Sequence, residues 1–330
     1  MKILFIGGTG NISLSVSRAV LALGHQLTLF NRRGAAELPE AECLVGDIGD
    51  AAATAALLRG RTWDAVVNWV AFTAADVERD IKLFDGRTGQ YVFISSASCY
   101  DATAARPWIT EETPLYNPHW EYSRAKITAE RRLLAAHRER RFPVTIVRPS
   151  LTYDRVIPLS IGGWLEYTTC ARIKAGKPIV VPGDGTSLWT ITHAEDFARG
   201  FVGLLGLPAA LGEAVHITSD EVLSWNAIYE QTAAALGKRA HIVHVTSDQI
   251  VATAPDYEGT LLGDKSVSAL FDNSKIKRLV PQFRCEIPYA DGIARTLAWF
   301  EQEPARRRIN RDTDALIERL LARFDPHHAP

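Results

Sequence analysis

Two side chains able to exchange protons, Tyr122 and Lys126, stand four residues apart in a segment that is predicted to be helical over residues 119–140. This spacing places both side chains on one face of a helix. A tyrosine hydroxyl has an ordinary pKa of about 10, so it exchanges protons poorly near neutral pH. A nearby ammonium favours the phenolate, and bringing the pKa down to about 7 needs roughly 4 kcal/mol of such stabilisation. The pair therefore predicts Tyr122 as a catalytic acid–base group and Lys126 as its activator.

Two serines, Ser96 and Ser98, follow an apolar segment, residues 90–95, that is predicted to be a strand. Ligands of open α/β sheets bind beyond the carboxyl ends of the strands. A hydroxyl at that edge can donate a hydrogen bond to the carbonyl oxygen of a substrate. We predict Ser96 as a catalytic residue and Ser98 as a substrate contact; the alternative is that each only caps the end of the strand.

Apolar runs that suit buried strands alternate with segments of helical periodicity over the first 220 residues. Residues 3–6, for example, are apolar without interruption, which is typical of a strand covered on both faces. The alternation predicts an α/β fold, a Rossmann-type doubly wound parallel sheet. The predicted strands are 3–6, 26–30, 42–45, 64–70, 90–95, 143–148 and 214–218, and the helices between them are 12–23, 50–59, 75–85 and 119–140.

The second half of the chain has a less regular pattern. Residues 151–192 are rich in glycine, proline and aromatic residues, and residues 220–290 mix short strand and helix patterns. We predict a dinucleotide-binding domain over residues 1–150, to which the strand at 214–218 returns. The remainder, residues 151–330, is predicted to be mainly a smaller, discontinuous substrate-binding lobe with a C-terminal helix.

A glycine-rich loop from Gly7 to Ser13 joins the first predicted strand to the first predicted helix. Gly7 permits a tight turn, and Gly10 lets the backbone approach the pyrophosphate of a dinucleotide at the helix N-terminus. Alone, such a loop also fits an ordinary strand-to-helix turn, but the strand before it and the helix after it supply the context of a dinucleotide site. The predicted cofactor contacts in this loop are Gly7, Thr9, Gly10, Asn11 and Ile12.

The second predicted strand is followed by Asn31, Arg32 and Arg33. Sites that prefer NAD usually carry an acidic residue here, which accepts a hydrogen bond from the ribose 2′-hydroxyl. Two arginines can instead neutralise the 2′-phosphate of NADP. We therefore predict NADP as the cofactor, with NAD as the alternative if both guanidinium groups are only solvated loop charges.

Composition argues against several other classes of protein. The 330 residues carry 37 basic and 38 acidic side chains, so the net charge of −1 gives no general attraction to nucleic acid or anionic membranes. The four cysteines form no C-x-x-C pair, and no metal site is predicted. No apolar stretch approaches the roughly 18 residues that span a bilayer, and the N-terminus lacks the form of a signal peptide. We expect a cytoplasmic protein that binds no nucleic acid and no membrane.

Together, these motifs resemble those of the extended short-chain dehydrogenase/reductase superfamily, and within it the NAD-dependent epimerase/dehydratase group. The resemblance covers roughly residues 1–200 and includes the segment from Arg148 to Tyr153, which is similar to the R-P-x-x-x-Y segment of the family. Ser13 departs from the pattern, because the family usually has a third glycine there. The stretch from Leu270 to Lys275 also resembles atypical relatives, the chloroplast stem-loop-binding proteins.

The resemblance implies roles for further residues. Asp47 matches an aspartate that contacts the adenine, Pro149 and Ser150 belong to a segment that passes the nicotinamide, and Lys126 holds the ribose hydroxyls. The implied cofactor contacts outside the glycine loop are Asn31, Arg32, Arg33, Asp47, Ile48, Asn68, Val70, Ala71, Tyr122, Lys126, Pro149 and Ser150.

The expected function is hydride transfer at a carbonyl or secondary alcohol of a small molecule, with Tyr122 giving or taking the proton. One alternative is a sugar or nucleotide-sugar epimerase/dehydratase that retains NAD. Another is a non-catalytic cofactor-sensing or RNA-binding protein on the same fold. The resemblance also implies a homodimer through the helices near 75–85 and 119–140.

The predicted substrate contacts are Ser98, Tyr153 and Trp189. Many family members that bind nucleotide-diphosphate sugars carry an arginine six residues after the first glycine of a G-D-G segment, and counting from Gly183 this position is Trp189. A tryptophan has one N–H and no charge, so it cannot replace a guanidinium–phosphate pair. We expect a smaller or less charged substrate; the alternative is that Trp189 only packs the interface between the lobes while Arg155 or Arg172 binds a phosphate.

Overall fold

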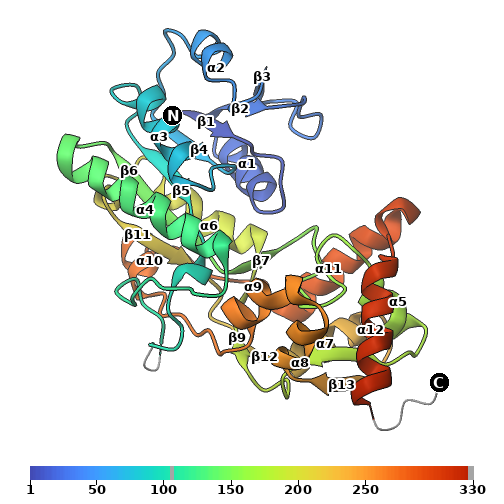
Figure 1. The fold of residues 1–330 in the computed structure, drawn as a ribbon. Helices are drawn as coiled ribbons and strands as arrows, with labels where there is room; N and C mark the ends of the chain where they lie inside the picture. Colours follow the sequence, from blue (N-terminus) through green and yellow to red (C-terminus); the bar gives the residue numbers. More distant parts are fainter. Residues whose placement is uncertain (105–107, 326–330) are drawn as a thin grey trace.

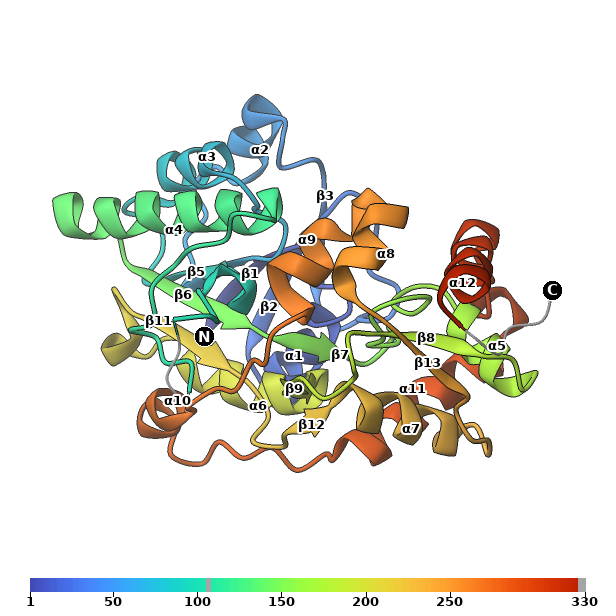
Figure 2. The same cartoon turned by 60° about the horizontal axis from the view of Figure 1, so that its bottom comes forward.

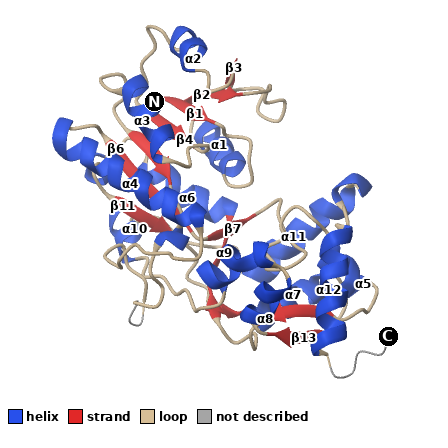
Figure 3. Cartoon of the chain, in the orientation of Figure 1, coloured by secondary structure: helices blue, strands red, loops and turns tan. Residues whose placement is uncertain are grey.

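The computed structural model describes residues 1–104 and 108–325. One part of the described chain is a seven-stranded parallel sheet with helices on both faces, and the other part is mostly helical with short strands (Figures 1 and 3). The predicted Rossmann-type doubly wound sheet is confirmed. In spatial order, its strands are β11 (Ala214–Ile217), β6 (Val144–Pro149), β5 (Tyr91–Ile94), β4 (Ala65–Asn68), β1 (Lys2–Ile6), β2 (Gln26–Asn31) and β3 (Glu42–Val45).

Helices cover both faces of this sheet because its central strands are apolar on both sides. Ile3 and Phe5 of β1 share a buried cluster with α1, α6 and α10, whereas Leu4 and Ile6 share one with α3 and α4. Figure 2 shows α3 and α4 side by side. The helices around the sheet are α1 (Ser13–Ala22), α2 (Ala51–Leu57), α3 (Ala74–Phe84), α4 (Glu121–Arg140), α6 (Ala194–Leu204) and α10 (Ser274–Leu279).

The order of the strands reverses beside β1, which pairs with β2 on one side and with β4 on the other. Ile6 at the end of β1 lies opposite both Phe30 and Asn68. The loops that follow β1, β2 and β4 therefore meet at one edge of the sheet. Such a switch point is where doubly wound sheets bind dinucleotides.

The second part of the molecule joins segments that are far apart in sequence. Its short strands pair as β7 (Leu151–Tyr153) with β10 (Ile191–His193), β8 (Ile179–Pro182) with β13 (Ile242–Val245), and β9 (Leu188–Trp189) with β12 (Leu223–Ser224). Strand β7 lies where the two parts meet (Figure 1). Its helices are α5 (Thr168–Lys174), α7 (Trp225–Ala235), α8 (Ser247–Thr253), α9 (Glu258–Thr260), α11 (Tyr289–Gln302) and α12 (Arg311–Phe324), with a π-helical turn at Leu261–Lys265.

Two buried clusters stabilise this part. One surrounds Trp225 and Tyr289, and the other packs the apolar stripe of α12 against β13 and α8. Within the described ranges, no helix is long and apolar enough to cross a membrane. The same residues contain no group of three His, Cys, Asp or Glu side chains that could hold a metal ion.

Candidate active site

The predicted catalytic residues meet at the carboxyl edge of the sheet. Tyr122 and Lys126 lie near the start of α4, and Ser96 lies just beyond β5. The Lys126 Nζ is 5.7 Å from the centroid of the Tyr122 ring. The Ser96 hydroxyl lies 2.8 Å from that of Ser98, which is in turn 2.8 Å from the Ser123 hydroxyl of α4. Hydroxyl groups therefore connect the end of β5 to the helix that carries Tyr122.

Lys126 is held by backbone carbonyls rather than by a carboxylate. Its Nζ donates to the carbonyl oxygen of Ala71 at 2.6 Å and to that of Ile94 at 2.7 Å. The ammonium also lies over the rings of Phe72 and Phe93, 4.4 and 4.9 Å from their centroids. The residue is 2% exposed, and this burial lowers the pKa of Lys126 to about 8. Lys126 thus joins the loop after β4 to the end of β5.

The pKa of Tyr122 differs from the expectation based on its spacing from Lys126. Burial raises the pKa of Tyr122 to about 12, and the nearby Cys99 adds to the rise, while a hydrogen bond with Ser96 opposes it. Desolvation of the phenolate is the largest cause of this rise. The role of Lys126 as the activator of Tyr122 stays a prediction for the site with its dinucleotide bound. At neutral pH, Tyr122 carries its proton.

The glycine loop after β1 has the backbone of a dinucleotide site. Gly7 and Gly8 have φ angles of +93° and +113°, which side chains rarely allow. A Cβ on Gly8 would lie 2.7 Å from the side chain of Leu29, so this position excludes larger residues. Thr9 and Gly10 are exposed, and α1 begins without a side-chain cap. The first N–H groups of α1 can therefore bind a pyrophosphate, and the loop fits the predicted cofactor.

Ser13 and Asn11 give this loop two further constraints. The Ser13 hydroxyl accepts from the Gly10 N–H at 2.8 Å, so the serine that replaces the family's third glycine supports the turn. The Asn11 amide donates to the Thr152 carbonyl at 2.8 Å and accepts from the N–H groups of Asp154 and Arg155 at 3.0 and 3.2 Å. The side chain of Asn11 thus links the glycine loop to the segment after β7.

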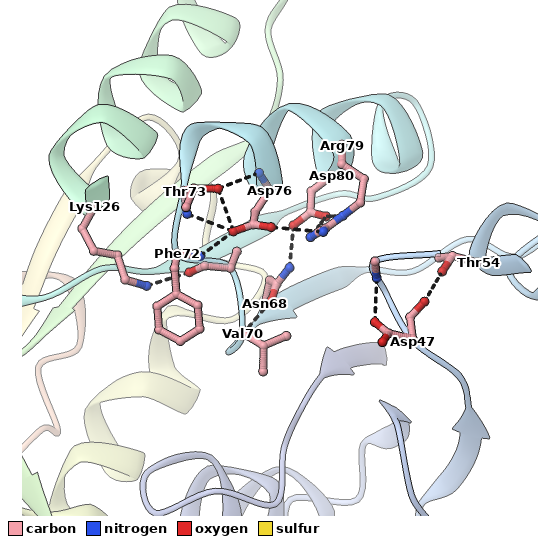
Figure 4. Close-up of polar contacts among 12 residues, drawn as sticks. Asp47, Thr54, Asn68, Val70, Phe72, Thr73, Asp76, Arg79, Asp80 and Lys126 are labelled. Atoms are coloured by element: carbon pink, nitrogen blue, oxygen red, sulfur yellow. Dashed lines mark hydrogen bonds and ion pairs between the residues drawn. The ribbon is translucent and has the colours of Figure 1, made fainter. Parts of the chain in front are cut away.

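The residues expected beside the adenosine lie after β2 and β3; they are Asn31, Arg32, Arg33, Asp47 and Ile48. Arg32 and Arg33 are exposed, and neither forms an ion pair within the described ranges. Asp47 accepts from the N–H of Gly49 at 2.8 Å (Figure 4). In the orientation that satisfies its neighbours, the amide of Asn31 donates to the carbonyl of the first loop glycine at 2.8 Å.

A buried carboxylate organises the loop after β4. Asn68 accepts from the N–H of Val70 at 2.8 Å and donates to Asp80 of α3 at 2.5 Å (Figure 4). Asp80 also accepts from the hydroxyl of Tyr91 at 2.6 Å and from Nε of Arg79 at 3.0 Å. Asp80 is fully buried, and this burial raises the pKa of its carboxyl group. No sequence motif indicates this network, because its members come from β4, α3 and β5.

The same loop is fixed on its other side by Asp76. This carboxylate accepts from the N–H groups of Phe72 and Thr73 at 3.0 and 2.9 Å, and the Thr73 hydroxyl accepts from the N–H of Asp76 in return (Figure 4). The resulting capping box starts α3. Between Asn68 and Asp76, the carbonyl of Ala71 is held where it accepts from Lys126.

Arg148 packs against α4, the helix that carries Tyr122, and does not belong to the described lining of the cavity at this edge of the sheet. Its guanidinium makes two hydrogen bonds to Glu130 of α4, at 2.9 and 2.5 Å, and both side chains are buried. It also lies 4.7 Å over the ring of Tyr100. Pro149 and Ser150, which follow Arg148 in the chain, line a cavity at this edge of the sheet.

A cavity of about 840 Å³ opens at this edge of the sheet and extends to the second part of the molecule. Ser96, Ser98 and Tyr122 line it, together with Ile12 of the glycine loop. This volume suits a small-molecule ligand. The structure therefore places Ser96, Tyr122 and the end of the glycine loop around one cavity, whereas the buried Lys126 does not belong to its described lining.

Asn117 is a site residue that sequence reasoning missed. Its amide donates to the carbonyl of Ser98 at 3.0 Å and to that of Gly263 at 2.6 Å. Its oxygen accepts from the N–H of Trp120 at 3.0 Å, just before α4 begins. One side chain thus connects the serine loop, the catalytic helix and the π-helical turn of the second part. An asparagine before a helix gives no sequence signal for contacts so distant.

Two of the three predicted substrate contacts line the cavity, and the third does not. Ser98 and Trp189 line the cavity, but Trp189 is only 2% exposed and its N–H donates to the carbonyl of Val267 at 2.9 Å. Its ring packs 5.5 Å from that of Trp225. Tyr153 is fully buried, with its hydroxyl 3.4 Å from the carbonyl of Tyr289, and it does not belong to the described lining of the cavity.

Neither arginine considered for phosphate binding belongs to the described lining of the cavity. Arg155 pairs with Glu37 at 2.7 Å, and the buried Arg172 pairs with Asp314 at 2.6 Å. Both therefore have structural partners.

A doubly wound sheet with a glycine loop at its switch point defines a dinucleotide-binding protein, and its cavity holds a tyrosine and a serine beside a buried lysine. The family model "NAD dependent epimerase/dehydratase family" matches residues 3–217, and the chain belongs to this family. It is accordingly an NAD(P)-dependent enzyme with an oxidoreductase site of the extended short-chain dehydrogenase/reductase type.

Relatives and solved structures agree with this assignment. The chain is 28% identical to 2'-dehydrokanamycin reductase of Streptomyces kanamyceticus over 288 residues, which span 86% of this chain and 80% of that protein. It is also 28% identical to a chloroplast stem-loop binding protein of 41 kDa from Arabidopsis thaliana, over 72% of this chain and 63% of the relative. The fold is similar to that of dTDP-glucose 4,6-dehydratase from Bacillus anthracis in complex with NAD, with a TM-score of 0.73, 20% identity and coverage of 93% of this chain and 98% of that chain.

Proposed function

We propose that this protein reduces a carbonyl group of a small molecule to an alcohol, with Tyr122 as the proton donor. The observation that carries the proposal is the meeting of Tyr122 and Ser96 at the wall of the cavity beside the glycine loop. The high pKa of Tyr122 supports this direction, because reduction needs a protonated phenol at the start of the reaction.

The residues then have distinct tasks. A bound nicotinamide dinucleotide supplies the hydride. Ser96 donates a hydrogen bond that orients and polarises the carbonyl oxygen, and Tyr122 transfers its proton to that oxygen. An ammonium has three donors, and Lys126 uses two of them on the carbonyls of Ala71 and Ile94. The third donor remains for the ribose hydroxyls of the cofactor.

NADP is the proposed cofactor. Arg32 and Arg33 stand exposed after β2, where a 2′-phosphate is expected, and no described carboxylate pairs with them. Two guanidinium groups without such partners can bind the phosphate.

The proposed substrate is not a nucleotide-diphosphate sugar. No arginine belongs to the described lining of the cavity, which includes the carboxylates of Asp101, Glu166 and Asp264. The nearby ammonium of Lys265 is already paired with Asp264 at 3.0 Å. A diphosphate would meet repulsion there. The similarity to 2'-dehydrokanamycin reductase, over 86% of this chain, supports a reductase acting on a different kind of compound.

Replacing Tyr122 by phenylalanine tests the proposal. We expect the Tyr122→Phe variant to lose most of the carbonyl-dependent oxidation of NADPH, followed at the nicotinamide absorbance, and to bind the dinucleotide nearly as before. Tyr116→Phe is the matched control, because Tyr116 also lines the cavity and is well exposed. Near-normal turnover by the Tyr122 variant would refute the role of Tyr122.

A retained-cofactor epimerase or dehydratase is the second candidate, and the similarity to a dTDP-glucose 4,6-dehydratase fold is the reason to test it. Calorimetry with UDP and dTDP on the cofactor-loaded protein separates the two. Micromolar binding of either nucleotide would favour this second candidate.

The homodimer through the helices near 75–85 and 119–140 stays a prediction. None of the exposed large apolar residues lies on α3 or α4, both of which are fully described. The exposed face of α4 instead carries Arg124, Arg131 and Arg138. A dimer through these helices would rest on polar contacts, and light scattering at low and high salt would detect it.

A further inference from the structure

The chain folds back on itself between Ile157 and Trp164, at one side of the cavity. These two residues form an isolated antiparallel bridge, in which the N–H of Ile157 donates to the carbonyl of Trp164 at 2.9 Å. The turn between them needs glycine. Gly162 has a φ of +65°, and a Cβ on Gly163 would lie 2.7 Å from the carbonyl oxygen of Ile157. The backbone of this turn is therefore tightly constrained.

Trp164 has a left-handed backbone at the end of the same turn, with a φ of +60°. This conformation is unfavourable for a bulky side chain, and such residues concentrate at ligand sites. The only other non-glycine residue of the described chain with a positive φ is Arg141, which ends α4. Left-handed residues are common at helix ends, so Arg141 has an ordinary explanation. Trp164 ends no helix.

The ring of Trp164 is left uncovered by the fold. The residue is 47% exposed, lines the cavity, and makes no ring-stacking or cation–π contact with another described residue. By contrast, Trp189 and Trp225 pack against each other and are nearly inaccessible. A strained position is thus occupied by a large apolar ring that contributes little to the core.

We propose that Trp164 is a specificity-determining residue that contacts the substrate, and that the substrate presents a ring or another flat apolar face to it. Aromatic side chains gain most when a flat apolar partner covers them. The inference rests on the proposed function, because it assigns the chemical class of the compound that enters the same cavity. Glycine would adopt the left-handed backbone at this position with less strain than tryptophan does. We therefore attribute the presence of the indole ring to contact with the substrate.

Binding of 4-nitrobenzyl alcohol, a flat aromatic alcohol, to the NADP-loaded protein tests the proposal by calorimetry. We expect Trp164→Gly to weaken this binding about fivefold or more, and Trp164→Phe to stay within about twofold of the wild type. Arg141→Gly is the matched control, since it makes the same replacement at a left-handed position outside the described cavity lining. It should leave binding unchanged.

Melting temperatures separate a contact role from a packing role. Glycine removes the strain of the left-handed backbone, which stabilises the folded state, but it also raises the conformational entropy of the unfolded chain, which opposes this gain. Both glycine variants should therefore melt within about 2 °C of the wild type or above it. A large fall for Trp164→Gly alone would show that the ring packs the lobe and would overturn the proposal. Equal binding by Trp164→Gly and the wild type, or no saturable binding by the wild type, would overturn it too. The measurement needs no turnover, so a failure of the reductase assignment would be seen separately in the NADPH assay.

Discussion

Replacing Asp80 by alanine is expected to lower the free energy of unfolding by about 3 kcal/mol. Two fully buried donors, the amide of Asn68 and the hydroxyl of Tyr91, would lose their partner, and each such loss costs about 1–3 kcal/mol. Arg79 is partly exposed, so its guanidinium can form hydrogen bonds with water instead, and the loss of its bond to Asp80 adds little to the cost in free energy of unfolding. The burial that raises the pKa of Asp80 shows that the charge is costly to bury, and its removal offsets part of the loss.

Urea unfolding of a double-mutant cycle measures this cost. Tyr91→Phe alone should cost about 1 kcal/mol, and the variant carrying both changes should be more stable than the sum of the two losses predicts, by at least about 0.5 kcal/mol. Asp85→Ala, an exposed carboxylate at the end of the same helix, is the control and should change little.

The Asp80→Ala variant should also bind the dinucleotide less tightly. Without Asp80, the amide of Asn68 is no longer fixed, and the hydrogen bond that it accepts from Val70 weakens. Loss of one such bond corresponds to a rise of about three- to tenfold in the Kd for NADPH. A cost of less than about 1 kcal/mol, or a strictly additive cycle, would refute the assignment of Asp80 as the group that holds this loop.

Two further predictions concern charged groups. The Arg32→Ala/Arg33→Ala variant should lose at least about tenfold in affinity for NADPH and little for NADH, as titrations of both will show; tighter NADH binding that the double change leaves untouched would make the arginines bystanders. The folded-state pKa of Lys126, about 8, lies below its ordinary value of 10.5, so the unfolded chain binds more protons between these values. This contribution to stability is present at higher pH and is lost as the pH falls through 8, by up to about 3 kcal/mol. Lys126→Met should remove this dependence, and parallel pH profiles of the two proteins would contradict the argument.

The sheet was predictable because its strands are buried on both faces and its helices are long enough to show their period. The strand predicted over 42–45 is observed at the same residues. The strand predicted over 64–70 ends earlier, at Asn68, because that side chain turns the backbone by accepting from Val70. Hydrophobic periodicity carries no information on such a cap.

The second part of the molecule was much less predictable. Strands β8 and β13 have four residues each and lie far apart in sequence, and β9 and β12 have only two residues each. Such segments are too short to show a period. They form because tertiary contacts select them, as when the N–H of Trp189 finds the carbonyl of Val267.

The site divides in the same way. Ser96 and Tyr122 could be predicted as site residues, because one follows the end of a strand, the other lies on a helix, and both match motifs of the family that the chain resembles. The pKa of Tyr122 could not be predicted, because it depends on burial and on the charge of Asp264, which comes from the second part of the molecule. The burial of Tyr153 could not be predicted for a similar reason, since its ring packs against His193 of β10 and Tyr289 of α11.

The side chain of Asn11 joins the glycine loop to the backbone of residues 152–155 through three hydrogen bonds. Thr152 lines the cavity, so a substrate that contacts it and a dinucleotide that contacts the loop act on a shared rigid element. Free energy spent by the first ligand on ordering this element is not required again from the second. We therefore expect the two binding equilibria to be linked, in which case each ligand changes the affinity for the other by the same factor.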